Sequence, residues 1–363
     1  MEFHTFHLVH WPKEWTQQQV YAYELELIQY AEDAGFDGVW LAEHHFRNYG
    51  ICPSIMPFAA FVAARTRKVK IGSAIVVLPF HHPLRAAEEA AEVDLLSGGR
   101  LMYGFGRGYQ SIEFQGFNIP LSEARERTDE IVDIMKLAWA DAPVTYHGKH
   151  YTIENVNVYP KPLQKPHPPM WSAAVSPETI RHHALRGMPF ITDPIATFGR
   201  CQRAADEWRA IAGPKGFDTA NVALGCQRGL IIGETEQEAR AMALRAHEMA
   251  KDENIVNLQS APIEKTGEFA AGYYYWKDRY LGKNQELTVD FFWDRVWIAG
   301  DPARCIKSLE SLEAMGFKHV IFTLGHYPSV TLEMNKRRLK VFSDSVIPHF
   351  KRKGRTQPSP KPA

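Results

Sequence analysis

The chain has 363 residues, of which 45% are hydrophobic and 23% charged, and its 42 lysine and arginine residues balance its 42 aspartate and glutamate residues. This composition is ordinary for a globular protein, and the charge balance argues against nucleic acid or a membrane surface as a partner. No apolar run reaches membrane-spanning length, and the N-terminal residues lack the pattern of a secretion signal. The four cysteines lie far apart without a CxxC pair, as is typical of free thiols in a reducing compartment. We therefore expect a cytoplasmic protein.

The first 110 residues alternate between strand and helix patterns with a period of about 32 residues. Short apolar runs predict strands, and longer runs with an apolar stripe at helical spacing predict helices. Gly35 follows one predicted helix and Pro83 begins another, as expected at a helix end and in a first turn. The predicted strands cover residues 3–9, 38–41, 69–78 and 101–105, and the helices cover 17–34, 53–64 and 83–96.

The alternation continues after an insertion. Residues 144–158 alternate in polarity around a central glycine, which predicts a small hairpin outside the main repeat. Further strands are predicted over 169–174, 189–192, 222–232 and 319–324, and further helices over 122–139, 178–185, 198–211, 235–249, 301–315 and 332–346.

Two segments do not follow the repeat. Residues 251–295 are rich in aromatic residues but lack a clear period. A connection of this length is usually functional or disordered, and its aromatic content argues against disorder, so we predict a partly helical lid. Residues 351–363 contain three prolines and several basic residues and predict a loose C-terminal tail. Residues 1–350 then form a single domain.

Eight strands with intervening helices predict a closed (β/α)8 barrel, the TIM-barrel fold. The competing fold is an open, doubly wound parallel sheet. That fold would place a glycine-rich phosphate-binding turn after the first strand. The turn here contains Val9, His10, Trp11 and Pro12 and no such glycines, so we favour the barrel.

Glu43, His44 and His45 follow the second predicted strand, at the position where parallel α/β proteins place their chemistry. Histidine exchanges protons near neutral pH, and adjacent residues at a strand end point to opposite sides. One histidine should therefore face the barrel mouth while the other packs or is oriented by a carboxylate. A purely structural histidine pair is an equally good interpretation. A metal site is a weaker one and we assign no ligand set, although other histidines lie near strand ends, at positions 4, 7, 10, 81 and 82.

Two further motifs suggest a phosphate site. Gly104, Gly106, Arg107 and Gly108 follow the fourth strand, where glycines allow close backbone approach and arginine offers a forked donor. The second motif is Val175-Ser176-Pro177-Glu178-Thr179, in which Ser176 predicts a helix N-cap and a helix N-terminus binds phosphate. Each motif has an alternative interpretation, as a simple turn and as a simple cap. The strand that ends before Arg107 directly precedes the strand that ends before Ser176 in the predicted barrel. This order places Arg107 and Ser176 at the same rim.

These motifs together resemble the bacterial luciferase-like flavin-dependent monooxygenases. The similarity covers most of the chain and is densest from Gly35 to Gly108. The first shared motif is Gly35-Phe36-Asp37-x-Val39-Trp40-Leu41-x-Glu43-His44-His45-Phe46. It is followed by Ala74-Ile75-Val76-Val77-Leu78-Pro79 and by His82-Pro83-x-Arg85-x-Ala87-Glu88. The later shared motifs are Gly98-Gly99-Arg100, Gly104-x-Gly106-Arg107-Gly108 and Gly300-Asp301-Pro302.

The resemblance implies a (β/α)8 barrel that uses reduced FMN, supplied by a separate NAD(P)H:flavin reductase, and O2. A flavin C4a-peroxide would then oxygenate an apolar organic substrate by Baeyer–Villiger insertion or hydroxylation. It further implies that His44 is the acid/base, with His45 and Glu43 in support, and that the chain is a homodimer. It also implies a set of cofactor-binding positions. Ala74 and Ile75 would be joined by a cis peptide beside the flavin ring, Arg107, Ser176 and Thr179 would hold the phosphate group, and Gly106 and Val175 would lie at the same site.

Two positions depart from the light-emitting members, which carry a reactive cysteine at the position of Gly106 and an acidic residue at that of Val175. The resemblance therefore does not extend to long-chain aldehyde bioluminescence. Two alternatives stay open beside the oxygenase. One is a deazaflavin-dependent oxidoreductase of the same superfamily, and the other is a non-catalytic flavin-binding partner subunit.

Overall fold

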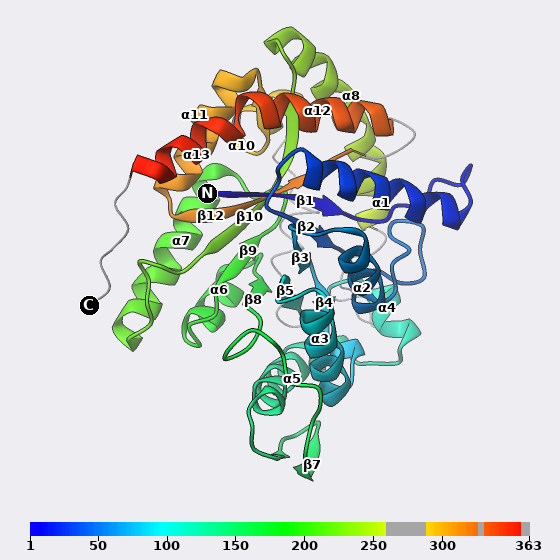
Figure 1. Ribbon diagram of the computed structural model, residues 1–363, viewed down its shortest axis with the longest axis vertical. Helices are drawn as coiled ribbons and strands as arrows, with labels where there is room; N and C mark the ends of the chain where they lie inside the picture. Colours follow the sequence, from blue (N-terminus) through cyan, green and yellow to red (C-terminus); the bar gives the residue numbers. More distant parts are fainter. Residues whose placement is uncertain (259–287, 326–329, 357–363) are drawn as a thin grey trace.

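A computed structural model describes residues 1–258, 288–325 and 330–356 of the chain. Parallel strands in this part of the chain close into a barrel (Figure 1). The closure is complete because the last strand pairs with the first, and β10 pairs with both of its neighbours. The eight barrel strands, in spatial order, are β1 (Glu2–His7), β2 (Gly38–Leu41), β3 (Lys70–Ser73), β5 (Leu101–Gly106), β8 (Met170–Ala173), β9 (Phe190–Thr192), β10 (Leu224–Ile232) and β12 (Phe317–Thr323). The predicted barrel is confirmed, and the open doubly wound sheet is excluded.

Helices surround these strands (Figure 1). Each helix buries one apolar stripe, because the side chains that recur every three or four residues point toward the sheet. In α1, the stripe includes Val20, Leu25 and Ile28, and a capping box of Thr16 and Gln19 begins the helix. The helices are α1 (Gln17–Asp33), α2 (Ile55–Arg65), α3 (Pro83–Leu96), α5 (Ala124–Trp139), α6 (Pro177–Ala184), α7 (Phe198–Ala212), α8 (Glu236–Leu258), α10 (Val289–Arg295), α11 (Pro302–Ala314), α12 (Leu332–Ser345) and α13 (Ile347–Thr356).

The inside of the barrel is packed with side chains. Trp40 on β2 and Trp171 on β8 contact each other with ring centroids 5.8 Å apart, although their strands are not neighbours. Met102, Ile191 and Ile321 complete this inner cluster. Because the strands are covered by helices outside and by these side chains inside, β2 and β5 are buried at every position. Any site must therefore lie at an end of the barrel.

The predicted strand over residues 69–78 differs from the observed structure. It divides into β3, β4 (Val76–Val77) and a short helical turn, η1 (Leu78–Phe80). The Ala74–Ile75 peptide between β3 and β4 is cis, as the resemblance implied. Two short elements were not predicted, α4 (Ser111–Gly116) and β11 (Ile298–Gly300), because six and three residues are too few to show a period.

The predicted hairpin is confirmed. Strands β6 (Val144–His147) and β7 (Thr152–Val156) pair in antiparallel fashion and project from the body of the molecule (Figure 1). Of the predicted lid over 251–295, residues 251–258 continue α8 and residues 289–295 form α10, while 259–287 lie outside the described residues. The lid therefore stays a prediction.

The predicted tail over 351–363 is wrong for its first residues, because α13 extends to Thr356. This helix is anchored where Ile347 and Phe350 are buried in the core, and Phe350 contacts the ring of Phe3 at 5.3 Å. Residues 357–363 lie outside the described residues. Among the helices that the structure describes, none is long and apolar enough to cross a membrane.

Candidate active site at the carboxyl ends of the strands

The predicted site residues lie where β2, β3, β5 and β8 end, and these four strands are consecutive neighbours in the barrel. Glu43, His44 and His45 follow β2, and Arg107 follows β5. Ala74 and Ile75 lie between them in the barrel, after β3. Val175, Ser176 and Thr179 follow β8. The fold thus brings all of the predicted positions to one rim, in neighbouring strands.

His44 is held by the segment that follows β5. Its Nδ1 lies 3.0 Å from Oε1 of Glu113 and 2.9 Å from the side-chain amide of Gln110. A carboxylate only accepts hydrogen bonds, whereas an amide nitrogen only donates them, so the contact with Glu113 uses a proton on Nδ1 and the contact with Gln110 uses a lone pair there. In the tautomer that pairs with Glu113, the Nε2 lone pair of the neutral ring is left for proton exchange. The side chain of Glu113 is 1% exposed and that of His44 is 15% exposed. The imidazole therefore has access to the site while the carboxylate that orients it does not.

Glu43 and His45 form a second pair, which is buried. Oε1 of Glu43 lies 3.1 Å from Nε2 of His45 and 3.1 Å from Nε2 of His81, and Oε2 accepts the backbone N–H of Val77 at 3.2 Å. Burial raises the pKa of Glu43, but the hydrogen bonds and charges of the two histidines outweigh it and hold the pKa below its ordinary value. His45 also donates its backbone N–H to Glu113. This pair thus supports the loop that carries His44.

Both pairs agree with the expectation that adjacent residues at a strand end diverge. His45 turns away to a carboxylate and to the rings of Phe80 and Phe117, whose centroids lie 5.6 and 4.7 Å from its own. His44 turns to α4 and is paired with a carboxylate as well. The expectation had allowed for one such carboxylate, and the structure shows two.

The Ala74–Ile75 segment, which follows β3, is tightly packed against the end of β5. A Cβ atom added at Gly106 would lie 2.3 Å from Cδ1 of Ile75. The glycine therefore leaves room for the Ile75 side chain. Ala74 and Ile75 are part-buried, and Val76 and Val77 pair in register with Phe105 and Gly106. The Ala74–Ile75 segment is thereby held against the end of β5.

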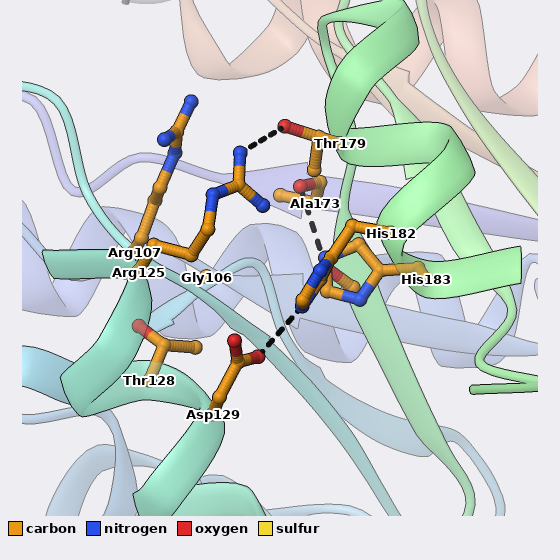
Figure 2. Close-up of a pocket in the computed structure, with 10 residues that line it drawn as sticks. Gly106, Arg107, Arg125, Thr128, Asp129, Ala173, Thr179, His182 and His183 are labelled. Carbon is orange, nitrogen blue, oxygen red and sulfur yellow. Dashed lines mark hydrogen bonds and ion pairs between the residues drawn. The ribbon is translucent and has the colours of Figure 1, made fainter. Parts of the chain in front are cut away.

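Cationic and hydroxyl groups gather at the ends of β5 and β8 (Figure 2). Ser176 is the N-cap of α6, and its Oγ accepts the backbone N–H of Thr179 at 3.2 Å and lies 3.0 Å from the Thr179 hydroxyl. Arg125, in the first turn of α5, donates from Nη2 to Thr179 Oγ1 at 3.4 Å and to the carboxylate of Glu178 at 3.1 Å. Figure 2 shows the side chains of Arg107 and Arg125 side by side, pointing in the same direction. Guanidinium groups and a helix N-terminus are groups that bind phosphate in proteins, as the sequence motifs had predicted for this rim.

Further polar residues line the same pocket. Ser172 Oγ lies 2.6 Å from Nε2 of His183, and Nε2 of His182 lies 2.9 Å from Asp129 (Figure 2). Burial, helped by the charge of His182, lowers the pKa of His183 to about 3, so its ring is neutral at physiological pH. Val175 contributes its backbone carbonyl, which accepts from Nη2 of Arg200 at 3.1 Å. These contacts fix the β8–α6 connection that carries Ser176 and Thr179.

Sequence reasoning missed Gln110, Glu113 and Arg125. Glu113 lies on α4, which is too short to predict, and Arg125 lies on a charged helix face that carries no local motif. His81 had been considered only as a distant metal ligand. These residues reach the site only because separate elements pack together. The local sequence pattern around each residue therefore could not predict its place in the site.

This arrangement defines a class of protein: a (β/α)8 barrel with cationic and hydroxyl groups and a carboxylate-paired histidine at the carboxyl ends of its strands. The family model described as luciferase-like monooxygenase matches residues 1–319. The chain therefore belongs to the luciferase-like monooxygenase family and is an enzyme of the flavin-dependent oxidoreductase class.

Relatives of known activity match over nearly the whole chain. The alkanal monooxygenase alpha chain of the Kryptophanaron alfredi symbiont is 27% identical over 359 residues, 97% of this chain and 99% of that protein. The oxygenase component of the flavin-dependent trigonelline monooxygenase of Acinetobacter baylyi is 26% identical, covering 92% of this chain and 91% of that one. The crystal structure of the monooxygenase RslO1 from Streptomyces bottropensis aligns with a TM-score of 0.79 at 26% identity, covering 96% of this chain and 100% of that one.

More distant structures share the fold alone. The oxygenating constituent of 3,6-diketocamphane monooxygenase from Pseudomonas putida, in complex with FMN, aligns with a TM-score of 0.76 at 16% identity, covering 96% of this chain and 98% of that one. An F420-dependent secondary alcohol dehydrogenase aligns with a TM-score of 0.71 at 18% identity, covering 95% and 98%. The same fold therefore occurs both in a protein that binds FMN and in an F420-dependent one.

Proposed function

We propose that this chain is the oxygenase component of a two-component monooxygenase that binds reduced FMN and oxygenates an apolar organic substrate with O2. The observation that carries the proposal is the juxtaposition on one rim of a phosphate cradle and an oriented histidine. In the order of the barrel strands, Arg107 and the α6 N-terminus follow β5 and β8, on one side of the Ala74–Ile75 segment, and His44 follows β2, on the other. Arg125 contacts Thr179 of α6, and Glu113 contacts His44.

The residues present fit FMN. The single phosphate group of FMN requires cationic and hydroxyl donors, which Arg107, Arg125, Ser176 and Thr179 supply. The isoalloxazine ring would then lie over Ala74 and Ile75. This position is apolar and lies one strand from His44. When bound and reduced, FMN supplies the electrons that activate O2.

His44 is the group that moves a proton in this site. Glu113 holds the imidazole by Nδ1, which leaves Nε2 for proton exchange with the bound substrate or cofactor. Glu43 and His45 stay buried beneath it and keep the loop in place. The role of the pair is therefore to position His44, and this division matches the one that the resemblance implied.

The sequence relatives favour a flavin monooxygenase over a deazaflavin enzyme. The two monooxygenase relatives are 27% and 26% identical to this chain, and one of them is named as flavin-dependent, whereas the F420-dependent barrels share its fold at 18% identity. The trigonelline enzyme is described as an oxygenase component, which supports a separate NAD(P)H:flavin reductase as the partner of this chain. A homodimer is part of the same proposal, because α2 and α3 expose large apolar side chains at Phe61, Leu95 and Leu96.

Anaerobic titration with reduced FMN tests the cofactor assignment. Arg107→Ala and Arg125→Ala should each weaken binding by about 10- to 100-fold, since each removes a charge-assisted hydrogen bond to the phosphate. Arg181→Ala is the matched control, because Arg181 lies on α6 as well but is exposed and pairs with Glu207. Its affinity should equal that of the wild type.

Coenzyme F420 is the competing ligand in the same titration. Tight binding of F420 without affinity for reduced FMN would contradict the proposal and establish the deazaflavin alternative. Oxygen uptake with a flavin reductase and a panel of ketones, aldehydes and aromatic compounds then tests turnover. Product formation by this chain alone with the reductase would exclude the non-catalytic partner subunit.

A further inference from the structure

A second group of histidine and carboxylate side chains lies at the opposite, amino end of the barrel. Glu2 and His4 belong to the start of β1, and His319 belongs to the start of β12. The two strands pair directly there, with Glu2 in register with His319. Lys70, the first residue of β3, completes what we call the amino-end cluster: Glu2, His4, Lys70 and His319. The proposed oxygenase site uses none of these residues.

Three atoms of the amino-end cluster converge on one point. Nε2 of His4 lies 3.0 Å from Nδ1 of His319. Oε2 of Glu2 lies 3.6 Å from the first nitrogen and 3.5 Å from the second. A tetrahedral zinc ion with bonds of about 2.0–2.1 Å holds its ligand atoms about 3.3–3.4 Å apart. The three observed distances, 3.0, 3.5 and 3.6 Å, lie on both sides of this value, so small side-chain movements would bring the atoms to the spacing of a zinc site.

The three ligands are also of the right chemical kind. Two imidazoles and one carboxylate form a common zinc set that leaves a fourth position for water. Among the described residues, this is the one group of three such side chains whose ligand atoms lie within 4.8 Å of one another. Glu2 is 34% exposed, so water and an ion reach the cluster from the end of the barrel.

We propose that Glu2, His4 and His319 bind a divalent cation of the zinc type, which cross-links β1 to β12 and so fastens the seam where the barrel closes. The proposal is independent of the flavin site. A zinc ion here is structural, because the ends of the strands that carry the chemistry lie at the other end of the barrel.

Metal binding requires one tautomer of His4. Nδ1 of His4 is buried and has no hydrogen-bond partner among the described residues. A metal on Nε2 would place the proton of the neutral ring on Nδ1 and would replace the direct contact between His4 and His319. Both rings are nearly inaccessible to solvent. Neutral imidazole is the form that binds a metal.

Lys70 competes with the cation. Its Nζ donates to Oε1 of Glu2 at 2.7 Å and to Oε2 at 2.8 Å. Oε1 keeps the lysine when Oε2 turns toward the metal, but the positive charge of Lys70 then lies beside the ion and weakens its binding. Lys70 therefore lowers the affinity of the site for the cation but does not prevent binding.

Zinc binding by tag-free, EDTA-treated protein tests the proposal, measured by competition with a chromophoric chelator. Wild type should bind one zinc ion per chain with a dissociation constant of about 1 μM or lower. Glu2→Gln and His319→Gln should weaken binding at least about tenfold, and Lys70→Gln should tighten it by about tenfold. Glu2 and Lys70 are part-exposed, so their variants should fold even if a histidine variant does not.

His150→Gln is the matched control, because His150 contacts Glu123 and Glu126 and forms another histidine–carboxylate group. It should bind zinc as the wild type does. Zinc should also raise the melting temperature of wild type and of His150→Gln but not that of Glu2→Gln. The proposal is overturned if wild type binds no zinc at tens of micromolar, or if Glu2→Gln and His319→Gln bind it as wild type does. Unchanged affinity in Lys70→Gln would remove the role of that lysine.

Discussion

The two ends of the barrel carry the same residue types in opposite arrangements. At the carboxyl end, the carboxylates of Glu43 and Glu113 are buried, and His44 and His81 are the more exposed partners. At the amino end, His4 and His319 are buried, and the carboxylate of Glu2 is part-exposed. Both ends therefore contain histidine–carboxylate pairs at hydrogen-bonding or near hydrogen-bonding distance, but the member that contacts water differs.

This difference decides what each end can do. A buried carboxylate beside a more exposed imidazole favours the protonated ring, as at His81, whose pKa burial lowers but Glu43 raises above its ordinary value. A buried imidazole loses solvation when charged, so the rings at the amino end stay neutral. The carboxyl end is therefore suited to proton transfer, and the amino end is suited to metal binding or to packing. Three predictions test this contrast.

The largest effect is expected at His44. His44→Ala should lower the rate of product formation by about 10²- to 10⁴-fold, since it removes the proton-exchanging group. The affinity for reduced FMN should change little, because the phosphate cradle lies on other strands. Steady-state oxygenation with saturating reduced FMN measures the rate.

Two further variants sharpen this prediction. Glu113→Gln should cause a smaller loss, because it replaces the carboxylate that orients the His44 ring with a neutral amide but keeps His44 itself. His147→Ala, on the exposed hairpin, is the control and should match the wild type. Full turnover in His44→Ala would show that His44 does not exchange the proton and that the carboxyl end is not distinguished by this role.

The next effect concerns stability at the amino end. His319 has a folded pKa of about 4, below the ordinary value of 6.5, so the unfolded chain binds the extra proton between these limits. Stability should thus fall on acidification through this window, by on the order of 2 kcal/mol between pH 7.5 and pH 5. His319→Gln should lose less stability than the wild type over the same range. Urea denaturation in EDTA at both pH values measures the difference, and equal losses would contradict it.

The smallest effect is expected at His81. The pKa of His81 is raised in the folded state, so its contribution is fully present below pH 6.5 and is lost as the pH rises through the folded pKa. His81→Gln should therefore destabilise the protein by about 1 kcal/mol at pH 6, where it removes a charge-assisted hydrogen bond to Glu43, and by less at pH 9. Urea denaturation at both pH values measures this loss of stability. A loss that grew with pH would show that the ring of His81 is not stabilised in its charged form.

Much of the barrel was predictable from the sequence because its elements depend on local pattern. The helix over 83–96 and the strand over 38–41 have the predicted bounds, since apolar period and proline and glycine positions act within a few residues. The motif at Ser176 predicted its N-cap for the same reason. Short elements such as α4 and β11 escaped prediction because they span less than two turns of helix or a few strand residues.

The sequence by itself determined the parallel α/β repeat, the histidine pair after β2, and the positions of Arg107 and Ser176 directly after two barrel strands. Only the tertiary structure decided which side chains meet. Glu113 reaches His44 across 69 residues, Arg125 reaches Thr179 across 54, and His319 reaches His4 across 315. Such contacts arise when strands close into a barrel and helices pack around it. Their energies depend on burial and on neighbouring charges, which no local pattern of residues records.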